Sequence, residues 1–238
     1  MVLRATQRSS FNRSCIIGAP TPFGELITRI SITAYFAWVG LSLAGKQTRW
    51  VLNQDFGNLT TTELLDFAAE TVDTFFYMAI AIFVVMRYRR VAAIGGLYPR
   101  LVALLGSFLF LLLVPFLPRN ELSPTLDLVS MLLMLSGSIL ATVVLLYLGR
   151  SFSILPEARR LVVTGPYRLI RHPLYATEMI CMLGLVMQFA VWSALIVLLI
   201  QCMFQLHRIL IEEQLLSRTF PEYEIYANNT ARLIPGLC

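Results

Sequence analysis

Two short polar clusters near the C-terminal end of the chain hold residue types that can bind and react with a charged substrate. The first is the segment Gly165–Tyr175, which contains His172 together with arginines, tyrosines and prolines. The second contains Arg208 and the pair Glu212-Glu213. Arginine suits carboxylates, and a carboxylate accepts hydrogen bonds from hydroxyl and ammonium groups. The two clusters together predict one active site, provided that the fold brings them to the same place.

The first cluster is expected to be a shaped, non-helical platform. Pro166 and Pro173 break regular structure, and the residue before each proline is biased toward an extended backbone. Long apolar runs flank the cluster on both sides. It is therefore predicted to lie against a membrane helix, at the membrane surface.

The composition predicts an integral membrane protein built from α-helices. Of the 238 residues, 57% are hydrophobic and 14% charged, and the mean hydropathy is +0.71. About a quarter of the residues in a soluble domain are charged. The net charge of +5 comes from cations in short clusters between apolar runs, which is typical of topology signals and indicates no nucleic-acid partner. The four cysteines, Cys15, Cys181, Cys202 and Cys238, form no CxxC pair.

About six transmembrane helices are expected, because a run of roughly 20 apolar residues spans a bilayer. The predicted spans are residues 26–44, 64–86, 97–117, 126–148, 174–189 and 192–210. The chain thus divides into four N-terminal spans (1–149) and a C-terminal catalytic region (150–238). The junction between the last two spans is so short that they must form a tight hairpin. This hairpin returns Arg208 to the membrane depth of His172, so the two clusters are predicted to meet.

Positive charge alternates between connections, which predicts the orientation. The N-terminal segment and the second and fourth connections are rich in arginine, and the other connections are poor in it. Both termini and both polar clusters are therefore expected on the cytosolic face, in the inner membrane of a bacterium.

Other polar residues have simpler interpretations. Asp66, Glu70 and Asp73 follow one face of the second span. The first two lie near a helix start, where water and the helix dipole favour carboxylates. A proton relay is the alternative, and Asp73 is the least explained of the three. Arg159 and Arg160 are expected to be surface charges, and Tyr223 and Tyr226 to pack the tail against the bilayer interface.

The order and spacing of several motifs carry a family resemblance. The motifs are Gly165-Pro166-Tyr167-Arg168, Arg171-His172-Pro173-Leu174-Tyr175, Arg208 with Glu212-Glu213, Phe220-Pro221-x-Tyr223, and Arg232-x-Ile234-Pro235-Gly236. Together they resemble the C-terminal catalytic region of the isoprenylcysteine carboxyl methyltransferase family. The resemblance covers about residues 150–238, and the first 150 residues share with that family only their membrane spans.

The resemblance implies a membrane-embedded methyltransferase that uses S-adenosylmethionine without a Rossmann domain. No GxGxxG motif follows a predicted strand, in agreement with that expectation. Carried over by motif, Leu161, Val162 and Tyr167 line the cofactor pocket, and His172, Pro173, Leu174 and Tyr175 contact the cofactor. Glu212 binds the cofactor from the opposite helix, and Arg208 holds the carboxylate of the substrate. Arg208 and Glu212 are the expected catalytic pair.

The chemistry agrees with these roles and leaves the acceptor open. A carboxylate acceptor is already anionic, so in-line methyl transfer needs no metal and no general base. An amine acceptor needs a base, for which Glu213 or His207 is available. The expected acceptor is a lipid-like or prenylated molecule, with the isoprenylcysteine carboxylate first and a phospholipid amine as the alternative. No feature specifies an oligomeric state.

The sequence agrees less well with two other functions, a membrane reductase and a transporter or channel. NADPH-dependent sterol reductases carry a similar C-terminal pattern, but they usually have Asn where this chain has Leu174. A transporter or channel predicts polar residues at the middle of several spans. Here the polar residues gather at one edge instead.

Overall fold

The computed structural model describes residues 16–17, 22–54, 57, 59–113, 116–119, 121–189 and 191–236. Cys15, Cys238 and the arginines of the N-terminal segment lie outside these residues.

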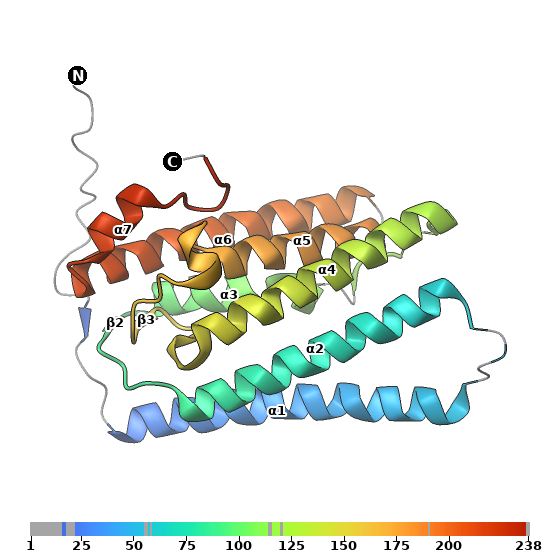
Figure 1. Cartoon of the computed structure of the whole chain (residues 1–238), viewed down its shortest axis with the longest axis horizontal. Coiled ribbons are helices and arrows are strands. Elements are labelled where there is room, and N and C mark those ends of the chain that lie inside the picture. The colour runs from blue at the N-terminus through green and yellow to red at the C-terminus, as the bar shows by residue number, and fades with distance from the viewer. Residues whose placement is uncertain are drawn as a thin grey trace.

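Long helices laid side by side make up most of the molecule (Figure 1). Their bounds are α1 (Pro22–Asn53), α2 (Thr61–Met86), α3 (Leu97–Leu113), α4 (Pro124–Leu148), α5 (Pro173–Met187) and α6 (Val191–Thr219), followed by the short α7 (Tyr223–Asn229). The chain is therefore an all-α membrane protein, as predicted, and each predicted span falls on a helix.

Helix length separates two kinds of helix in this bundle. Four helices, α1, α2, α4 and α6, are long and apolar enough to cross a membrane. In contrast, α3 has 17 residues and α5 has 15. At 1.5 Å per residue these are about 22–26 Å long, against a hydrocarbon core of about 30 Å. Among the described residues, four of the about six predicted spans are therefore confirmed as helices long enough to cross a membrane, and the other two fall on shorter apolar helices.

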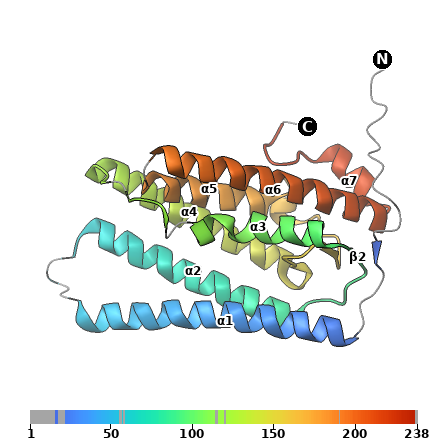
Figure 2. The same cartoon turned by 180° about the vertical axis from the view of Figure 1, so that it is seen from behind.

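The helices are arranged in layers, which the two opposite views show. The hairpin of α1 and α2 lies along one side, and α2 packs on α4. Helix α4 packs in turn on α5, while α3 lies beside α6 (Figure 2). Helix α3 also meets α1, because the Phe108 ring lies 5.9 Å from the Tyr35 ring.

Sequence signals explain where two of these helices begin. Thr60 and Glu63 form a capping box at α2: the Thr60 hydroxyl accepts from the Glu63 amide and the Glu63 carboxylate accepts from the Thr60 amide. At α4 the Ser123 hydroxyl accepts from the Leu126 amide, and Pro124 lies in the first turn. Both caps satisfy amides that the helix itself leaves unpaired.

Small residues let α4 and α5 approach closely. The Ser130 hydroxyl donates to the Gly184 carbonyl across this interface at 2.8 Å. A Cβ at Gly137 would lie 2.7 Å from the Cys181 amide nitrogen, and one at Gly184 would lie 2.6 Å from the Ser130 carbonyl oxygen. Close backbone approach at small residues is a common way to join helices in membranes. It fixes α5, the helix that begins with the polar cluster around His172.

The polar end of the bundle carries the non-helical structure (Figure 1). A small antiparallel sheet joins β1 (Ile16–Ile17), β2 (Ala92–Ile94) and β3 (Glu157–Ala158) in that order. The platform includes one 3₁₀ turn, η5 (Gly165–Arg168), and a parallel bridge between Ile170 and Ala231. The prediction that the platform is wholly non-helical was therefore wrong for η5, because Pro166 at the start of a turn fits helical geometry.

Candidate active site

The hairpin of α5 and α6 brings the two polar clusters together. The Tyr175 hydroxyl donates to Glu212 Oε2 at 2.6 Å. His172 Nε2 lies 3.2 Å from Glu213 Oε1. The rings of His172 and Tyr175 stack, with centroids 5.5 Å apart and planes 10° apart. Consecutive glutamates of α6 thus hold neighbouring rings at the start of α5, which confirms the predicted convergence.

Glu213 is the centre of an ion-pair cluster that fastens the C-terminal segment to the platform. Its carboxylate lies 2.9 Å from Arg171 Nη1 and 2.7 Å from Arg232 Nη2. The backbone amides of Arg171 and His172 donate to the carbonyls of Ala231 and Arg232 at 2.8 and 3.1 Å. The start of the closing Arg232-x-Ile234-Pro235-Gly236 motif therefore contacts the platform, the other motif of the family resemblance.

Arg208 is a buried cation without an ion-pair partner among the described residues. Its residue is 8% exposed, and its guanidinium donates to Ser107 Oγ at 2.7 Å and to the Ile154 carbonyl at 3.2 Å. The guanidinium carbon lies 4.8 Å from the centre of the Tyr175 ring. Among the described residues, no carboxylate forms an ion pair with Arg208. Buried arginines are usually paired, and here the negative charges of Glu178 and Glu212 act on Arg208 without an ion-pair contact.

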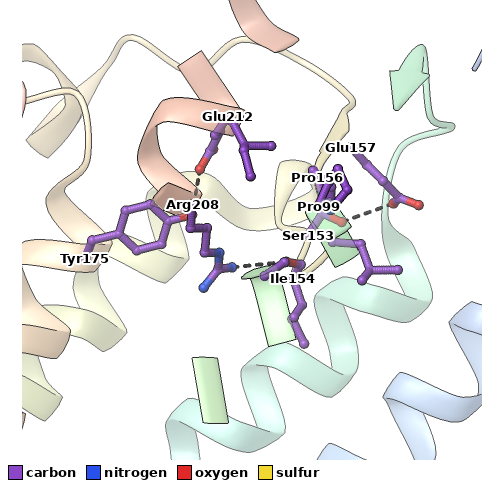
Figure 3. A pocket seen from close by; sticks show the side chains of 11 residues that line it. Pro99, Ser153, Ile154, Pro156, Glu157, Tyr175, Arg208 and Glu212 are labelled. Carbon is purple, nitrogen blue, oxygen red and sulfur yellow. Dashed lines mark hydrogen bonds between the residues drawn. The ribbon is translucent and has the colours of Figure 1, made fainter. Parts of the chain in front are cut away.

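A cavity opens beside Arg208 and is bounded by α3, α5, α6 and the loop at residues 153–157 (Figure 3). It holds about 330 Å³ of space, its open mouth included. Its lining residues are Pro99, Ala103, Ser153, Ile154, Leu155, Pro156, Glu157, Tyr175, Arg208, Ile211 and Glu212. Apolar side chains thus surround a small group of charged ones, which is typical of a site for an amphiphilic ligand.

The predicted site residues fall into two groups in the structure. Tyr175, Arg208 and Glu212 line the cavity, and His172 stacks on Tyr175 behind it. The others do not line it. Tyr167 and Leu174 are buried in the hydrophobic core, Val162 packs against that core, Pro173 is buried at the start of α5, and Leu161 is half-buried. Their assignment to the cofactor remains a prediction.

Tyr167 and Tyr226 explain how the tail of the chain meets the platform. The Tyr226 hydroxyl donates to the Tyr167 carbonyl at 2.6 Å. Burial raises the pKa of Tyr226 to about 12, so this hydroxyl keeps its proton at neutral pH. Tyr223 is 3% exposed. The expectation that both tyrosines pack against the bilayer interface was wrong for Tyr223, which is buried in the protein, and stays a prediction for the half-buried Tyr226.

Several polar residues around the cavity were not foreseen from the sequence. Glu178 lies one turn beyond Tyr175 on α5 and accepts a hydrogen bond from Gln205 Nε2 at 2.7 Å. Gln205 in turn lies one turn before Arg208 on α6. Their helical spacing from Tyr175 and Arg208 was the available signal. Ser107, on α3, offered no such signal.

Arg159 departs from its expected role as a surface charge, whereas Arg160 is exposed as predicted. The Arg159 side chain is 1% exposed and lies 2.6 Å from a Glu157 carboxylate oxygen. Burial by itself raises the pKa of Glu157, but the positive charges of Arg159, Arg87 and Arg90 lower it below its usual value. Glu157 is thus an ionised, fully engaged carboxylate at the cavity wall.

The acidic residues of α2 lie away from the cavity. Asp66 is exposed, and Glu70 pairs with Lys46 of α1. Asp73 lies beside Ser138 of α4. None of the three lines the cavity. The proton relay therefore stays an alternative to the simpler explanation from the helix start.

The geometry can be compared with known proteins. Residues 125–223 match the phospholipid methyltransferase family. The matched segment runs from α4 to the start of α7 and includes every cavity-lining residue except Pro99 and Ala103 of α3. The match supports a membrane methyltransferase with a lipid-like substrate.

A curated relative matches over a shorter segment. It is the nickel-cobalt-cadmium resistance protein NccN of Alcaligenes xylosoxydans xylosoxydans, 38% identical over 82 residues. The alignment covers 34% of this chain and 38% of the relative. Within the described part of this chain, no group of three or more His, Cys, Asp or Glu residues is arranged to hold a metal ion.

Methyltransferases in general draw the methyl group from S-adenosylmethionine, and the residues at this cavity suit that molecule. Glu212 provides a carboxylate for a hydroxyl or ammonium group, and the Tyr175 hydroxyl holds that carboxylate in place, while the Tyr175 ring itself contacts His172 and Arg208. Glu212 and Tyr175 are the residues that would hold the donor.

Proposed function

We propose that this protein is an S-adenosylmethionine-dependent methyltransferase that methylates the carboxylate of an isoprenylcysteine or a similar amphiphile. The observation that carries the proposal is Arg208, a buried guanidinium that forms no ion pair within the described part of the chain and lies at a cavity with both apolar and polar walls. A prenylated carboxylate matches both features, because its anion suits Arg208 and its hydrocarbon suits the membrane.

Arg208 holds the acceptor in this scheme. Ser107 and the Ile154 carbonyl occupy part of its guanidinium and fix its direction, which leaves other N–H groups for a carboxylate. When bound, S-adenosylmethionine supplies an electrophilic methyl group on a sulfonium. Arg208 would hold the acceptor so that a carboxylate oxygen faces the donor, which Glu212 would hold. No proton moves, so the chain contributes positioning and the exclusion of water.

Glu212 and Tyr175 form the donor side. Their 2.6 Å hydrogen bond fixes the carboxylate in place on the face of α6 that meets α5. Because Arg208 lies one turn before Glu212 on the same helix, donor and acceptor ligands can be held within one helical turn of each other.

The proposal places the reaction on the cytosolic face of a bacterial inner membrane. The starts of α1, α3 and α5 and the end of α6 lie at the same end of the bundle as the sheet (Figure 1). Arginines of the second and fourth connections gather at that end, and the positive-inside rule assigns such an end to the cytosol.

A phospholipid amine is the second candidate acceptor, and the description of the matched family favours it. An amine must lose a proton before or during transfer. Glu213, one of the expected bases, is already held by Arg171, His172 and Arg232. His207 is exposed on α6 and is not among the residues that line the cavity. These placements favour the carboxylate acceptor.

Ligand titration and label transfer test the proposal. The purified protein is titrated with S-adenosylmethionine and with NADPH, and only the first is expected to bind. Glu212→Ala is expected to abolish donor binding, while Arg208→Ala keeps it and loses turnover. Saturable NADPH binding without donor binding, or equal loss of donor affinity in both variants, would contradict the assigned roles.

A further inference from the structure

A chain of ion pairs connects the first helix to the wall of the cavity. Arg159 Nη1 lies 3.3 Å from Glu25 Oε1 on α1, and Arg159 Nη2 lies 2.6 Å from Glu157 Oε2. The other Glu157 oxygen lies 3.1 Å from Arg90 Nη1. The side chains of Arg159 and Glu157 are 1% and 7% exposed, and that of Glu25 is 16% exposed. Such shielding from water makes the arrangement far more rigid than a surface ion pair.

Glu157 holds the loop that forms one wall of the cavity. Its Oε2 accepts from the Ser153 hydroxyl at 3.1 Å, as Figure 3 shows, so the carboxylate closes the loop on itself. Backbone pairing of Glu157 with Ala93 ties the same loop to β2. Between Ser153 and Glu157 lies Ile154, whose carbonyl accepts from Arg208 Nη2 at 3.2 Å. A shift of the loop therefore moves one of the two groups that direct Arg208.

The start of α1 is itself fixed to the end of α2. Arg87 Nη2 donates to the Glu25 carbonyl at 3.4 Å, and Arg29 Nη1 donates to the Val85 carbonyl at 3.3 Å. Glu25 is thus held at the point where it meets Arg159. This anchor lies outside residues 125–223, the part of the chain that matches a known family.

We propose that Glu25 is a positioning residue for the active site: through Arg159 and Glu157 it fixes the 153–157 wall and the direction of Arg208. Without the Glu25 carboxylate, Glu157 alone faces the guanidiniums of Arg87, Arg90 and Arg159. Burial and the neighbouring Arg159 lower the pKa of Arg87 to about 10, yet Arg87 remains charged at neutral pH. The unbalanced arginines then repel one another, and the loop loses its fixed position.

The test compares two neutralised glutamates on the same helical hairpin. Glu25→Gln breaks the chain to the cavity wall. Glu70→Gln breaks the Lys46–Glu70 pair, which joins α1 and α2 at the other end of the hairpin, and serves as the matched control. Hydrogen exchange of the amides of residues 153–157 is the first readout. We expect it to be about tenfold faster in Glu25→Gln and unchanged in Glu70→Gln.

Kinetics give the second readout, which alone rests on the proposed methyl transfer. KM for the acceptor is expected to rise about tenfold in Glu25→Gln, since a misplacement of about 1 Å by a remote change costs up to a hundredfold. The dissociation constant of the donor stays unchanged. Glu25→Asp, which keeps the charge, restores part of the acceptor affinity.

Opposite results overturn the proposal. Unchanged exchange at residues 153–157 in Glu25→Gln would show that Arg159 and Glu157 hold the wall without α1. Faster exchange throughout α4, α5 and α6 would assign Glu25 a general stabilising role. If the unaltered protein transfers no methyl group, the proposed function fails, while the exchange comparison still decides the role of Glu25.

Discussion

Gly165 offers a sharp test of how the platform is held, because its backbone and its surroundings both exclude a side chain. Its φ of +60° lies in the left-handed region, and a Cβ there would lie 2.3 Å from Cδ1 and 2.8 Å from Cγ of Tyr147 on α4. Rotation of the ring about its own axis does not relieve the overlap, since Cγ lies on that axis. Gly165→Ala therefore has to move the platform away from α4 or turn the whole Tyr147 side chain, which is 53% exposed, out of the way.

The size of the effect follows from these distances. Carbon atoms pack at about 3.5 Å or more, so the contact must open by about 1.2 Å. The left-handed backbone costs alanine about 1–2 kcal/mol, and overpacking adds typically about 1–3 kcal/mol. A shift of about 1 Å next to His172 and Tyr175 should lower turnover between about tenfold and a hundredfold.

Gly236 supplies the control, because its φ is +83° and, apart from its neighbours in the chain, no atom of the described residues lies within 4 Å of the position of its Cβ. Gly236→Ala carries the backbone cost alone. Methyl transfer and thermal unfolding are measured for both variants in the same detergent. Turnover is expected to fall strongly in Gly165→Ala and little in Gly236→Ala. Equal turnover in the two variants would refute the claim that contact with α4 sets the platform.

Three further outcomes follow from the structure. Tyr175→Phe should weaken donor binding about tenfold by calorimetry, because loss of the hydrogen bond from the Tyr175 hydroxyl lets the Glu212 carboxylate leave the position that would bind the donor; unchanged affinity would contradict this. Gly184→Ala should lower Tm, since its Cβ meets α4 backbone, whereas Gly45→Ala, whose nearest contact is 3.8 Å, should raise it by gaining helix propensity. The arginines that lower the pKa of Glu157 make its stabilising effect complete above about pH 4.3 and lost as the pH falls through the lowered pKa. Corrected hydrogen-exchange protection of residues 153–157 should fall over that range, and Glu157→Gln should abolish this dependence.

The sequence predicted the bundle and the meeting of the two clusters for one physical reason. Long apolar runs and short connections leave few arrangements of helices in a membrane. The short junction before α6 forces a hairpin, and a hairpin returns Glu212 beside Tyr175. Both inferences use only residues that are near in sequence or on facing helices.

The cavity wall could not be predicted in this way. Arg208 is directed by Ser107, about a hundred residues away in the chain, and by the carbonyl of Ile154. Arg159 is buried because Glu25 and Glu157 converge on it from distant segments. Such contacts depend on how loops pack across the end of the bundle, and no periodic pattern of residues records them.

Transfer of a labelled methyl group tests the proposed carboxylate methylation most directly, because it shows which bond forms on the acceptor. Purified protein is given donor with a labelled methyl group together with a prenylcysteine analogue, the matching carboxamide, or vesicles containing phosphatidylethanolamine. Arg208 is proposed to hold a carboxylate, so label should appear on the free acid alone and should be released by mild base as methanol. Base-stable label on phosphatidylethanolamine, with none on the acid, would contradict the account.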